Sequence, residues 1–524
     1  MAQAGTPETQ DAQEVAPAEH ATPTPAVATE RRPPLTIGTG VYERQAKSRW
    51  QRLRGPFYVV LIICLLAFGV NLVADAVGLN RTFTVQVENE QPVTVDLRAA
   101  APRSPYVFGV NAFPSSATVS QDGASGFMHY NTDLTQSIAS MGVTMMRFPG
   151  GTWGEEHTLS LDQIDTFLQL AKQTGSQPLV QVRLQGGTAQ AAAAMVSYTN
   201  NPKSPLRVGR ASAPAMPVTY WVIGNEPDLI GASYTVADYT RDFIAYATAM
   251  KGADPSIHIL GPEISQYNGP DAPPLDAAGT PWLDGFLRGV GAYESAHHVR
   301  LLDGVTVHRY PFGSTLGSVG MLFSSSQEWR YLAPLLQEQI QQDMGHSLPI
   351  GVTEINTSAL SGAQITPTAT ALWWADTLGT LLEEHATYVD YFGLQGIDRP
   401  YMLLNASGSQ TPLSRVMEMY RHMLPETIPV GGPSSPVSIY ASTSKDNHHL
   451  ALMLINKGPT NAAVVAQTHG WFSGWPSVHT TVPAYGIVCI TIDDSGAGQI
   501  YTFAPTATMV AHGDAGIIVK ASIP

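Results

Sequence analysis

Residues 219–228 read Thr-Tyr-Trp-Val-Ile-Gly-Asn-Glu-Pro-Asp, and they set the pattern for most of the chain. The run Thr219–Gly224 is short and rich in β-branched and aromatic residues, which favours a buried strand. An amphipathic pattern over Ala237–Gly252 follows it and predicts a helix. A strand followed by a helix is the repeating unit of a parallel sheet.

The same unit recurs between residues 104 and 425. The strand-like runs are Tyr106–Asn111, Val143–Phe148, Pro178–Leu184, Thr219–Gly224, Ile257–Gly261, Gly304–His308, Pro349–Thr353 and Tyr388–Gln395. Helical patterns between them include Leu161–Thr174, Ala237–Gly252, Gln327–Met344 and Thr370–His385. Eight strands alternating with helices predict an α/β fold, a (β/α)8 TIM barrel over residues 104–425. A doubly wound open sheet is the alternative, although no Gly-rich dinucleotide motif follows the first strand.

The pattern changes on both sides of this barrel. Short β-like runs separated by turn residues occupy Val437–Ala441, Leu450–Asn456, Ala463–Gln467 and Gly486–Ile492. They predict an accessory antiparallel β-sandwich over residues 426–524. Thr82–Val87 and Val93–Leu97 are also strand-like, so we expect residues 80–103 to add strands to the same sandwich.

The N-terminal part differs from the rest in composition. Residues 1–55 hold few large apolar side chains, which predicts a disordered tail. Phe57–Val70 is an uninterrupted run of 14 residues, and the apolar stretch continues to Leu79. We interpret residues 57–79 as one transmembrane helix, since about 20 residues span a bilayer. Basic residues before the run place the tail in the cytoplasm and the rest outside, bound to the cell membrane by a single pass. A cleaved signal peptide and a secreted protein are the alternative.

Composition excludes several classes of function. The chain has 524 residues, a formal net charge of −14 and only 13% charged residues. An acidic surface repels phosphate backbones, so we expect no nucleic-acid partner, and it disfavours a polyanionic sugar. Two cysteines exclude a disulfide framework, and no Cys/His pattern has zinc spacing. Phosphate-loop, nucleophile-elbow and His-Glu-x-x-His motifs are also absent, so we expect no cofactor and no metal.

Two glutamates, Glu226 and Glu354, stand where apolar strands end. Active sites of parallel barrels lie at these carboxyl ends. Period-2 alternation places Glu226 on the same face as Val222. It places Glu354 on the face of Ile350 and Val352, and we expect both faces to point into the barrel. Two converging carboxylates suit glycoside hydrolysis, in which one protonates the leaving oxygen and the other attacks or activates water.

Other strand ends supply candidates for binding a sugar. Arg147 ends the second strand and would orient the nucleophilic carboxylate, with a structural ion pair as the alternative. His308 and Tyr310 end the sixth strand and would hydrogen-bond the nucleophile or the sugar, with a buried structural histidine as the alternative. A tryptophan on this edge would stack on a sugar face. That tryptophan is Trp153, while Glu263 is a candidate to line the cleft and Gln395 a candidate to bind the substrate.

The motif Gly224-Asn225-Glu226-Pro227 on the fourth strand, with Glu354 on the seventh, resembles the clan A glycoside hydrolases, which are retaining (β/α)8 enzymes. The resemblance implies that Glu226 is the acid/base, that Glu354 is the nucleophile, and that Asn225 hydrogen-bonds the sugar 2-hydroxyl. The stretch that begins at Arg147 is similar to an Arg-x-Pro-Gly-Gly stretch of arabinofuranosidase-like members. The sandwich resembles the accessory domain of arabinofuranosidase, β-xylosidase, β-glucuronidase and heparanase-like families, and the residues after Glu354 match no single one of them.

These observations together predict a membrane-anchored, extracytoplasmic retaining glycoside hydrolase that acts on oligo- or polysaccharides. One rival is a non-catalytic carbohydrate-binding or scaffold protein on a hydrolase barrel, but the presence of Asn225, Glu226 and Glu354 counts against it. A transglycosylase of the cell envelope would use the same residues and differ only in its acceptor. The predicted partners are a carbohydrate and a membrane, and the pattern leaves the oligomeric state open.

Overall fold

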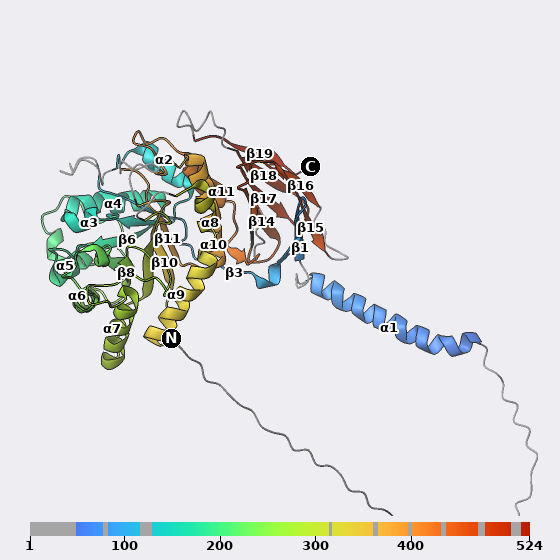
Figure 1. The fold of residues 1–524 in the computed structure, drawn as a ribbon, viewed down its shortest axis with the longest axis horizontal. Helices are drawn as coiled ribbons and strands as arrows, with labels where there is room; N and C mark the ends of the chain where they lie inside the picture. The colour runs from blue at the N-terminus through green and yellow to red at the C-terminus, as the bar shows by residue number, and fades with distance from the viewer. Residues whose placement is uncertain are drawn as a thin grey trace, which may run out of the picture. The chain divides into compact units, whose positions relative to one another are not determined.

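The computed structural model describes residues 49–76, 82–115, 128–313, 317–359, 365–396, 401–430, 436–469, 477–504 and 515–523. The chain divides into two compact units, Met1–Leu66 and Ala67–Pro524. The second unit holds both the parallel barrel and the antiparallel sheets (Figure 1). Barrel and sandwich are therefore parts of one compact body.

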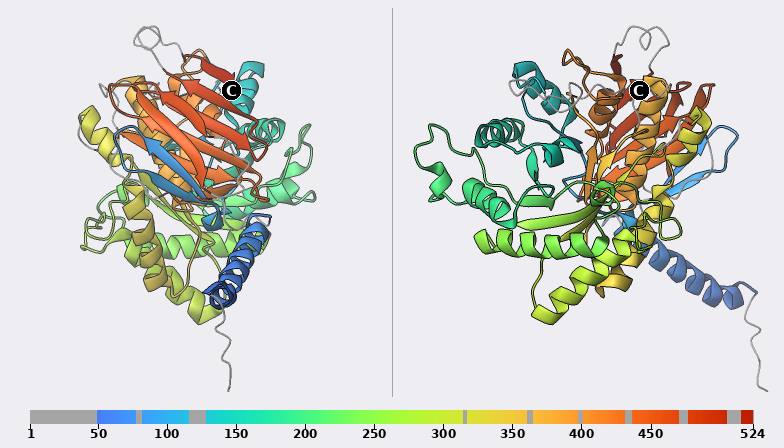
Figure 2. Two further views of the ribbon diagram at one scale, coloured as in Figure 1. Left: turned by 90° about the vertical axis from the view of Figure 1, so that its right-hand side faces the viewer. Right: turned by 60° about the vertical axis from the view of Figure 1, so that its left-hand side comes forward.

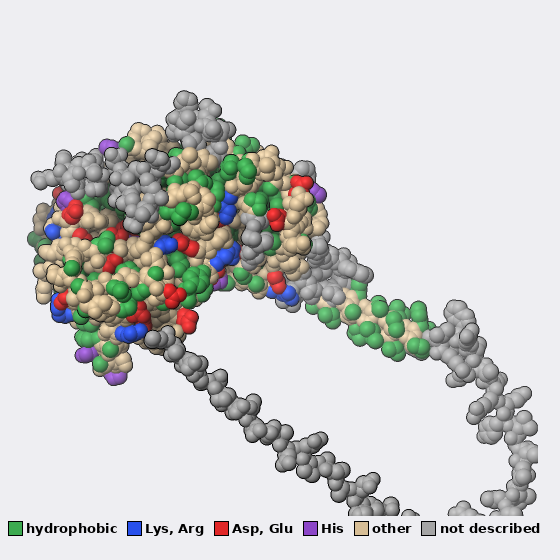
Figure 3. Space-filling view, in the orientation of Figure 1, with side chains coloured by type: hydrophobic (Ala, Val, Ile, Leu, Met, Phe, Trp, Pro, Cys, Tyr) green, Lys and Arg blue, Asp and Glu red, His purple; other side chains and the backbone are tan. Residues whose placement is uncertain are grey.

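The first helix of the described residues, α1 (Arg49–Ala76), contains the apolar run. Most large apolar side chains between Phe57 and Val73 are exposed, and they cover this helix in Figure 3. The sequence predicts a transmembrane helix over residues 57–79. No helix in the described ranges is both long and apolar enough to cross a bilayer. Residues 1–48 of the predicted disordered tail lie outside the described residues.

Eight parallel strands close into a barrel in the order β10-β11-β4-β5-β6-β7-β8-β9. They are β4 (Gly109–Asn111), β5 (Met145–Phe148), β6 (Gln177–Val182), β7 (Tyr220–Ile223), β8 (His258–Ile264), β9 (Gly304–Arg309), β10 (Ile350–Ile355) and β11 (Tyr388–Tyr391). Each lies within or next to a predicted strand. The predicted TIM barrel is confirmed, and closure excludes the open doubly wound sheet.

Helices cover the outside of the barrel (Figure 2). They are α2 (Thr132–Met141), α3 (Trp153–Glu156), α4 (Leu161–Thr174), α5 (Ala189–Asn200), α6 (Val236–Ala253), α7 (Trp282–His297), α8 (Val319–Ser325), α9 (Trp329–Met344), α10 (Pro367–Glu383) and α11 (Pro412–Tyr420). Helix α4 has the bounds that the sequence predicts. Ser160 and Gln163 form a capping box at its start, and Gly175 ends it in the left-handed conformation.

The barrel interior changes from apolar to polar along its axis. The layer nearer the N-terminal ends of the strands is a separate apolar cluster of Met145, Leu179, Val222, Leu260 and Tyr388. Two residues further along three of these strands, inward positions hold polar side chains, namely Arg147, Gln181 and Asp390. Barrel cores are normally packed with branched apolar side chains, so the polar layer marks the functional end.

Two antiparallel sheets form the accessory part. The order of the smaller one is β16-β15-β1-β2, and that of the larger one is β19-β18-β17-β14-β13-β12-β3. Their bounds are β1 (Thr82–Val87), β2 (Val93–Asp96), β3 (Ala101–Pro102), β12 (Glu426–Ile428), β13 (Val437–Thr443), β14 (His449–Asn456), β15 (Ala462–His469), β16 (Val478–Val482), β17 (Ile487–Asp493), β18 (Gly498–Phe503) and β19 (Ile518–Ser522). Strands that precede the barrel in the sequence pair here with strands that follow it, since β1 pairs with β15 and β3 with β12. The expected β-sandwich with N-terminal strands is observed.

The larger sheet uses both of its faces. Leu452 and Leu454 of β14 belong to the core between the two sheets. Ala451 and Met453 of the same strand belong to the barrel core instead. Helix α10 contacts this second face and is buried along nearly its whole length. The alternation on β14 therefore joins sandwich and barrel through one shared helix.

Candidate active site

A β-bulge turns Glu354 into the barrel. Val352 of β10 pairs with Val307 of β9, but the next pair is Glu354 with His308, so Thr353 is an extra residue on β10. Ile350 and Val352 pack in the core shared with the helices. The expectation that these two residues face inward with Glu354 is wrong. The bulge shifts the alternation by one residue and thereby brings Glu354 beside the inward His308.

A second bulge does the same for Glu263 on β8. Pro262 pairs with Thr306 of β9 and Ile264 pairs with Val307, which leaves Glu263 as the extra residue. Its φ of 62° lies in the left-handed region, where non-glycine residues are uncommon. Glu226, just after β7, also has a positive φ, of 45°. Irregular backbone therefore aims both of these acidic side chains, and bulges of this kind cluster at active sites.

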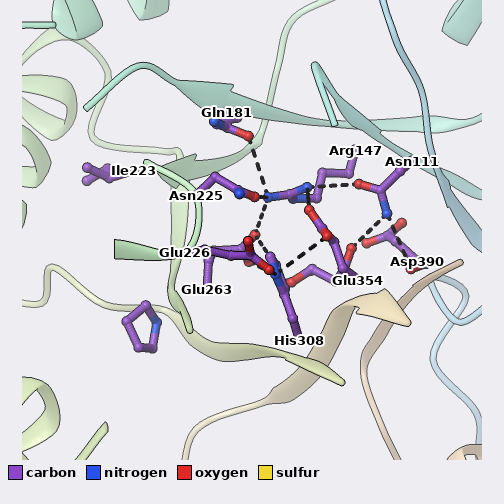
Figure 4. Close-up of polar contacts among 12 residues, drawn as sticks. Asn111, Arg147, Gln181, Ile223, Asn225, Glu226, Glu263, His308, Glu354 and Asp390 are labelled. Atoms are coloured by element: carbon purple, nitrogen blue, oxygen red, sulfur yellow. Dashed lines mark hydrogen bonds and ion pairs between the residues drawn. The ribbon is translucent and has the colours of Figure 1, made fainter. Parts of the chain in front are cut away.

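Arg147 forms hydrogen bonds and ion pairs with several side chains of the polar layer (Figure 4). It is fully buried, and its Nη1 donates at 2.8 Å both to Asn111 Oδ1 and to Glu354 Oε1. Its Nη2 donates to Asn225 Oδ1 at 2.6 Å and forms an ion pair with Glu263 Oε2 at 2.7 Å. A guanidinium matches this task because its donors are fixed in one plane. It holds side chains from four other strand ends in register.

His308 carries a carboxylate on each ring nitrogen. Nδ1 lies 3.0 Å from Glu226 Oε1 and 3.7 Å from an oxygen of Glu354, and Nε2 lies 3.2 Å from Glu263 Oε2. Burial opposes a charge on this imidazole, but the three carboxylates outweigh burial and raise its pKa to about 10. The ring is therefore an imidazolium that donates in two directions.

Glu354 and Glu226 differ in their surroundings. Glu354 is buried and accepts from Arg147 and, at 2.7 Å, from the Tyr310 hydroxyl. Burial raises the pKa of Glu354, and the positive charges of His308 and Arg147 oppose that shift. The Glu226 side chain is 16% exposed and is the more accessible of the two. The pair thus combines a carboxylate that accepts two hydrogen bonds with one that is partly exposed to solvent.

The carboxylates of Glu226 and Glu354 lie close together. One ligand atom from each, with one from His308, falls within 4.8 Å of the others. These three residues are of types that bind metals, but His308 approaches Glu226 at a hydrogen-bonding distance. An imidazolium has no lone pair to offer a cation. The cluster therefore fits a proton-transfer site better than a metal site.

Most of the predicted site residues meet in this cluster. Asn225, Arg147, His308 and Tyr310 join Glu226 and Glu354 through the contacts above. Trp153 has other contacts: it is 6% exposed, begins helix α3 and stacks on His157 with ring centroids 4.6 Å apart. The amide of Gln395 binds the backbone of two other residues, His129 and Asn405.

Glu263 has a different place from the one expected. It is fully buried, so it does not line a cleft open to solvent. Its Oε1 accepts from the Thr353 hydroxyl at 2.6 Å, in addition to the contacts with Arg147 and His308. Burial alone would raise the pKa of Glu263, but Arg147 and His308 lower it to about 2. It is ionised at every pH at which the protein is expected to work.

Three polar residues of the cluster were missed at the sequence level, namely Asn111, Gln181 and Asp390. Gln181 lies 3.5 Å from Arg147, and the Asn111 amide donates to the backbone of Thr353 and Asp390. Burial raises the pKa of Asp390 well above its usual range. The signal was present, because each is a polar residue at an inward position of an otherwise apolar strand.

Known proteins share this fold and part of this sequence. The sequence model of glycoside hydrolase family 44 matches residues 206–312. An α-L-arabinofuranosidase from Thermotoga maritima has a TM-score of 0.56 and 14% identity, with 76% of this chain and 99% of that chain covered. A family 44 xyloglucanase from Paenibacillus polymyxa has a TM-score of 0.52 and 14% identity, covering 76% and 99%. The chain is a glycoside hydrolase.

Other comparisons agree with this assignment. CelM2, a bifunctional glucanase-xylanase from a metagenome library, has a TM-score of 0.54 and 16% identity and covers 76% of this chain and 98% of its own. No curated protein matches. The family 44 match contains Asn225, Glu226, Glu263, His308 and Tyr310, and it ends before β10. The resemblance to clan A glycoside hydrolases is thus confirmed. The sequence model matches residues 206–312, and the shared fold extends the likeness to the barrel and the sandwich.

Proposed function

We propose that this glycosidase is a retaining enzyme in which Glu354 is the nucleophile and Glu226 the acid/base. One observation carries the proposal: a carboxylate oxygen of each residue lies within 4.8 Å of the other. Retaining enzymes hold their two carboxyl groups about 5–5.5 Å apart, whereas inverting enzymes need about 6.5–9.5 Å to admit a water molecule. The short separation favours direct attack on the sugar.

The donors around each carboxylate support the two roles. Arg147 and Tyr310 both donate to Glu354, which stabilises its anionic form and orients it for attack on the anomeric carbon. Glu226 is more exposed, which suits a group that gives its proton to a leaving oxygen and later takes one from water. The two steps together retain the anomeric configuration.

Asn225 is the proposed contact to the substrate. Its side-chain oxygen is already occupied by Arg147, so its amide nitrogen is the group left to donate. The resemblance to clan A enzymes suggests the sugar 2-hydroxyl as the acceptor, a contact that strengthens in the transition state. We propose His308, Tyr310 and Arg147 as supports for the catalytic pair and Trp153 as a wall residue, because its ring is almost fully buried.

A neutral oligo- or polysaccharide is the proposed substrate. The similar proteins are described as arabinofuranosidases, a xyloglucanase and a glucanase-xylanase, all of which act on uncharged sugars. The chain itself has a net charge of −14. Such a surface repels polyanionic glycans and does not hinder neutral ones.

The test uses the parent protein and a panel of aryl glycosides that includes arabinofuranosides, xylosides and glucosides. We expect hydrolysis with retention, observed by NMR of the first-formed product. A 2-fluoro glycoside of the accepted sugar should then label Glu354, identified by peptide mass spectrometry. Inversion of configuration, or a label on Glu226, would refute the assignment of roles. Binding without hydrolysis across the panel would favour the scaffold alternative.

We also propose that the enzyme acts outside the cytoplasm. The support is the run of apolar residues in α1, preceded by basic residues. Protease added to intact cells should degrade the barrel. Degradation that requires lysis of the cells would contradict the proposal. Alkaline extraction of membranes then separates an anchored form from a secreted one.

A further inference from the structure

His308 stands between an ionised carboxylate behind it and the catalytic pair in front of it. Behind it, Glu263 Oε2 lies 3.2 Å from Nε2. In front, Nδ1 lies 3.0 Å from Glu226 and 3.7 Å from Glu354. One nitrogen of a neutral imidazole carries no hydrogen, and it would then face a carboxylate lone pair. When Glu226 and Glu263 are both ionised, the arrangement is satisfied only if both nitrogens carry hydrogen.

Glu263 is built to remain an anion. It is fully buried, and donors from three strands reach it: Arg147 on β5, His308 on β9 and the Thr353 hydroxyl on β10. A buried carboxylate without such partners would take up a proton. Here the backbone bulge of β8 is what brings the carboxylate to these donors.

We propose that Glu263 is a positioning residue that holds His308 in its imidazolium form, so that one fixed positive charge serves both catalytic carboxylates in turn. This inference rests on the retaining mechanism proposed above. Glu263 does not touch the substrate in it, and acts only through His308.

The charges balance throughout such a reaction. Arg147 and His308 are positive, Glu263 is negative, and one further negative charge makes the cluster neutral. In the first step Glu354 forms a bond to the anomeric carbon as the bond to the leaving oxygen breaks, and Glu226 gives that oxygen its proton. The negative charge has then moved from Glu354 to Glu226. In the second step water attacks the same carbon, its proton passes to Glu226, and the released Glu354 regains the charge.

His308 can follow this movement without moving itself. Its Nδ1 already reaches both carboxylates, so the same N–H faces the anion in either half of the cycle. Glu226, Glu263 and Glu354 face the ring directly. Arg147, Asp228 and Asp390 complete the charged surroundings, and burial raises the pKa of both aspartates. Glu263 is therefore the fixed anion on this side of the imidazole.

The direct test is nitrogen NMR of protein labelled with ¹⁵N-histidine, with the His308 signals assigned by their loss in His308→Gln. In the parent, both ring nitrogens should show imidazolium signals up to at least pH 8. In Glu263→Gln the titration midpoint of His308 should fall by about two pH units, as expected for loss of a close opposite charge. Glu294→Gln is the matched control. Glu294 is a buried carboxylate that accepts from the backbone N–H groups of Leu301 and Leu302, in the loop after helix α7.

A neutral His308 in the parent at pH 7 would overturn the inference, and this result needs no folded variant. An unchanged midpoint in a folded Glu263→Gln protein would overturn it as well. Both measurements are independent of turnover. Failure of the proposed function would instead appear as absence of glycoside hydrolysis by the parent.

The pH profile of hydrolysis gives a second readout. In Glu263→Gln, His308 loses its charge at a lower pH than in the parent, which raises the pKa of the acid/base Glu226, so the alkaline limb of the kcat/KM profile should move to higher pH by about one unit. Glu263→Asp keeps the charge and should restore most of the parent profile. A uniform loss of rate without displacement of the alkaline limb would show a merely structural role and overturn the inference.

Discussion

Two buried clusters in this molecule each contain ion pairs and differ in what surrounds those pairs. The catalytic cluster consists of Arg147, Glu226, Glu263, His308 and Glu354 at the open end of the barrel. The interface cluster lies between helix α10 and the sandwich and consists of Ser326, Gln327, Asp376, Tyr440 and Lys457. Both contain at least one largely buried ion pair between a carboxylate and a cation.

The interface cluster is closed. Asp376 Oδ1 accepts from Gln327 and from the Tyr440 hydroxyl, each at 2.7 Å, and its Oδ2 accepts from Ser326 and Lys457. These donors lower the pKa of Asp376 in spite of burial. Every oxygen is satisfied by a group of this chain, so the carboxylate has no capacity left for a ligand.

The catalytic cluster has more acids than cations and one side open. Four carboxyl groups, those of Glu226, Glu263, Glu354 and Asp390, surround two cations. A shifted pKa alone would mark both clusters as candidates for function, and only the mismatch of charge and the exposure of Glu226 separate them. Buried ion pairs are therefore weak evidence for a site until their unsatisfied groups are counted.

The largest effect should follow from Glu354→Gln. Loss of the nucleophile should lower kcat/KM by about 10⁴-fold or more on every accepted glycoside. The melting temperature should change little, because Arg147 and His308 keep Glu263 and Glu226 as counter-charges and the amide keeps the size of the side chain. Steady-state kinetics and thermal unfolding measure the two quantities, with Glu294→Gln as a control of normal activity. A Glu354→Gln protein with parental activity would contradict the assignment of this cluster, and not the interface cluster, as the catalytic one.

Glu226→Ala should have a smaller effect that depends on the leaving group. A general acid contributes about 10²–10⁴-fold, and a substrate with a poor leaving group needs that contribution in full. Activated dinitrophenyl glycosides should lose much less in their first step. A series of aryl glycosides of increasing leaving-group pKa measures this dependence. Equal losses across the series would contradict the role of Glu226 as the acid.

The sequence predicted the barrel well because its signals are local. Helix α4 carries its own start and stop signals at Ser160 and Gly175, and its bounds were predicted in full. The convergence of Glu226 and Glu354 was also expected, although the reasoning for Glu354 was wrong. Strict alternation ignored the bulge at Thr353. A bulge depends on pairing with a neighbouring strand, which leaves no local pattern to detect.

The same limit explains why Glu263 was considered as a candidate to line the cleft. Its position after Gly261-Pro262 indicated a strand end, but its burial depends on Arg147, His308 and Thr353 from other strands. In contrast, the inward polar residues Asn111, Gln181 and Asp390 were detectable from parity alone. Marking the inward positions of each predicted strand, as for Arg147 on its own strand, would have found them.

Disrupting the interface cluster should affect stability without affecting catalysis. Asp376→Asn leaves the largely buried Lys457 without its counter-charge, so we expect about 3 kcal/mol less stability in chemical denaturation. Activity per folded molecule should stay at the parental level. The double variant with Lys457→Met should lose less than the sum of the single losses, since the two residues are in contact. A large loss of kcat in folded Asp376→Asn would contradict the separation of the two clusters.

The effect expected over the narrowest range of conditions concerns Glu383, which lies seven residues after Asp376 on the same helix and faces Arg330 and the backbone N–H of Val430. Burial raises the pKa of Glu383 to about 7, in spite of the opposing charge of Arg330. The folded state therefore holds a proton that the unfolded chain releases near pH 4.5. Stability should decrease as pH rises from about 4.5 to 7, by up to about 3 kcal/mol, and become constant above. Glu383→Gln should remove this slope in unfolding measured across that range while the pH profile of catalysis stays unchanged. A catalytic profile that moved with Glu383 would mean that the interface and the active site are coupled through α10.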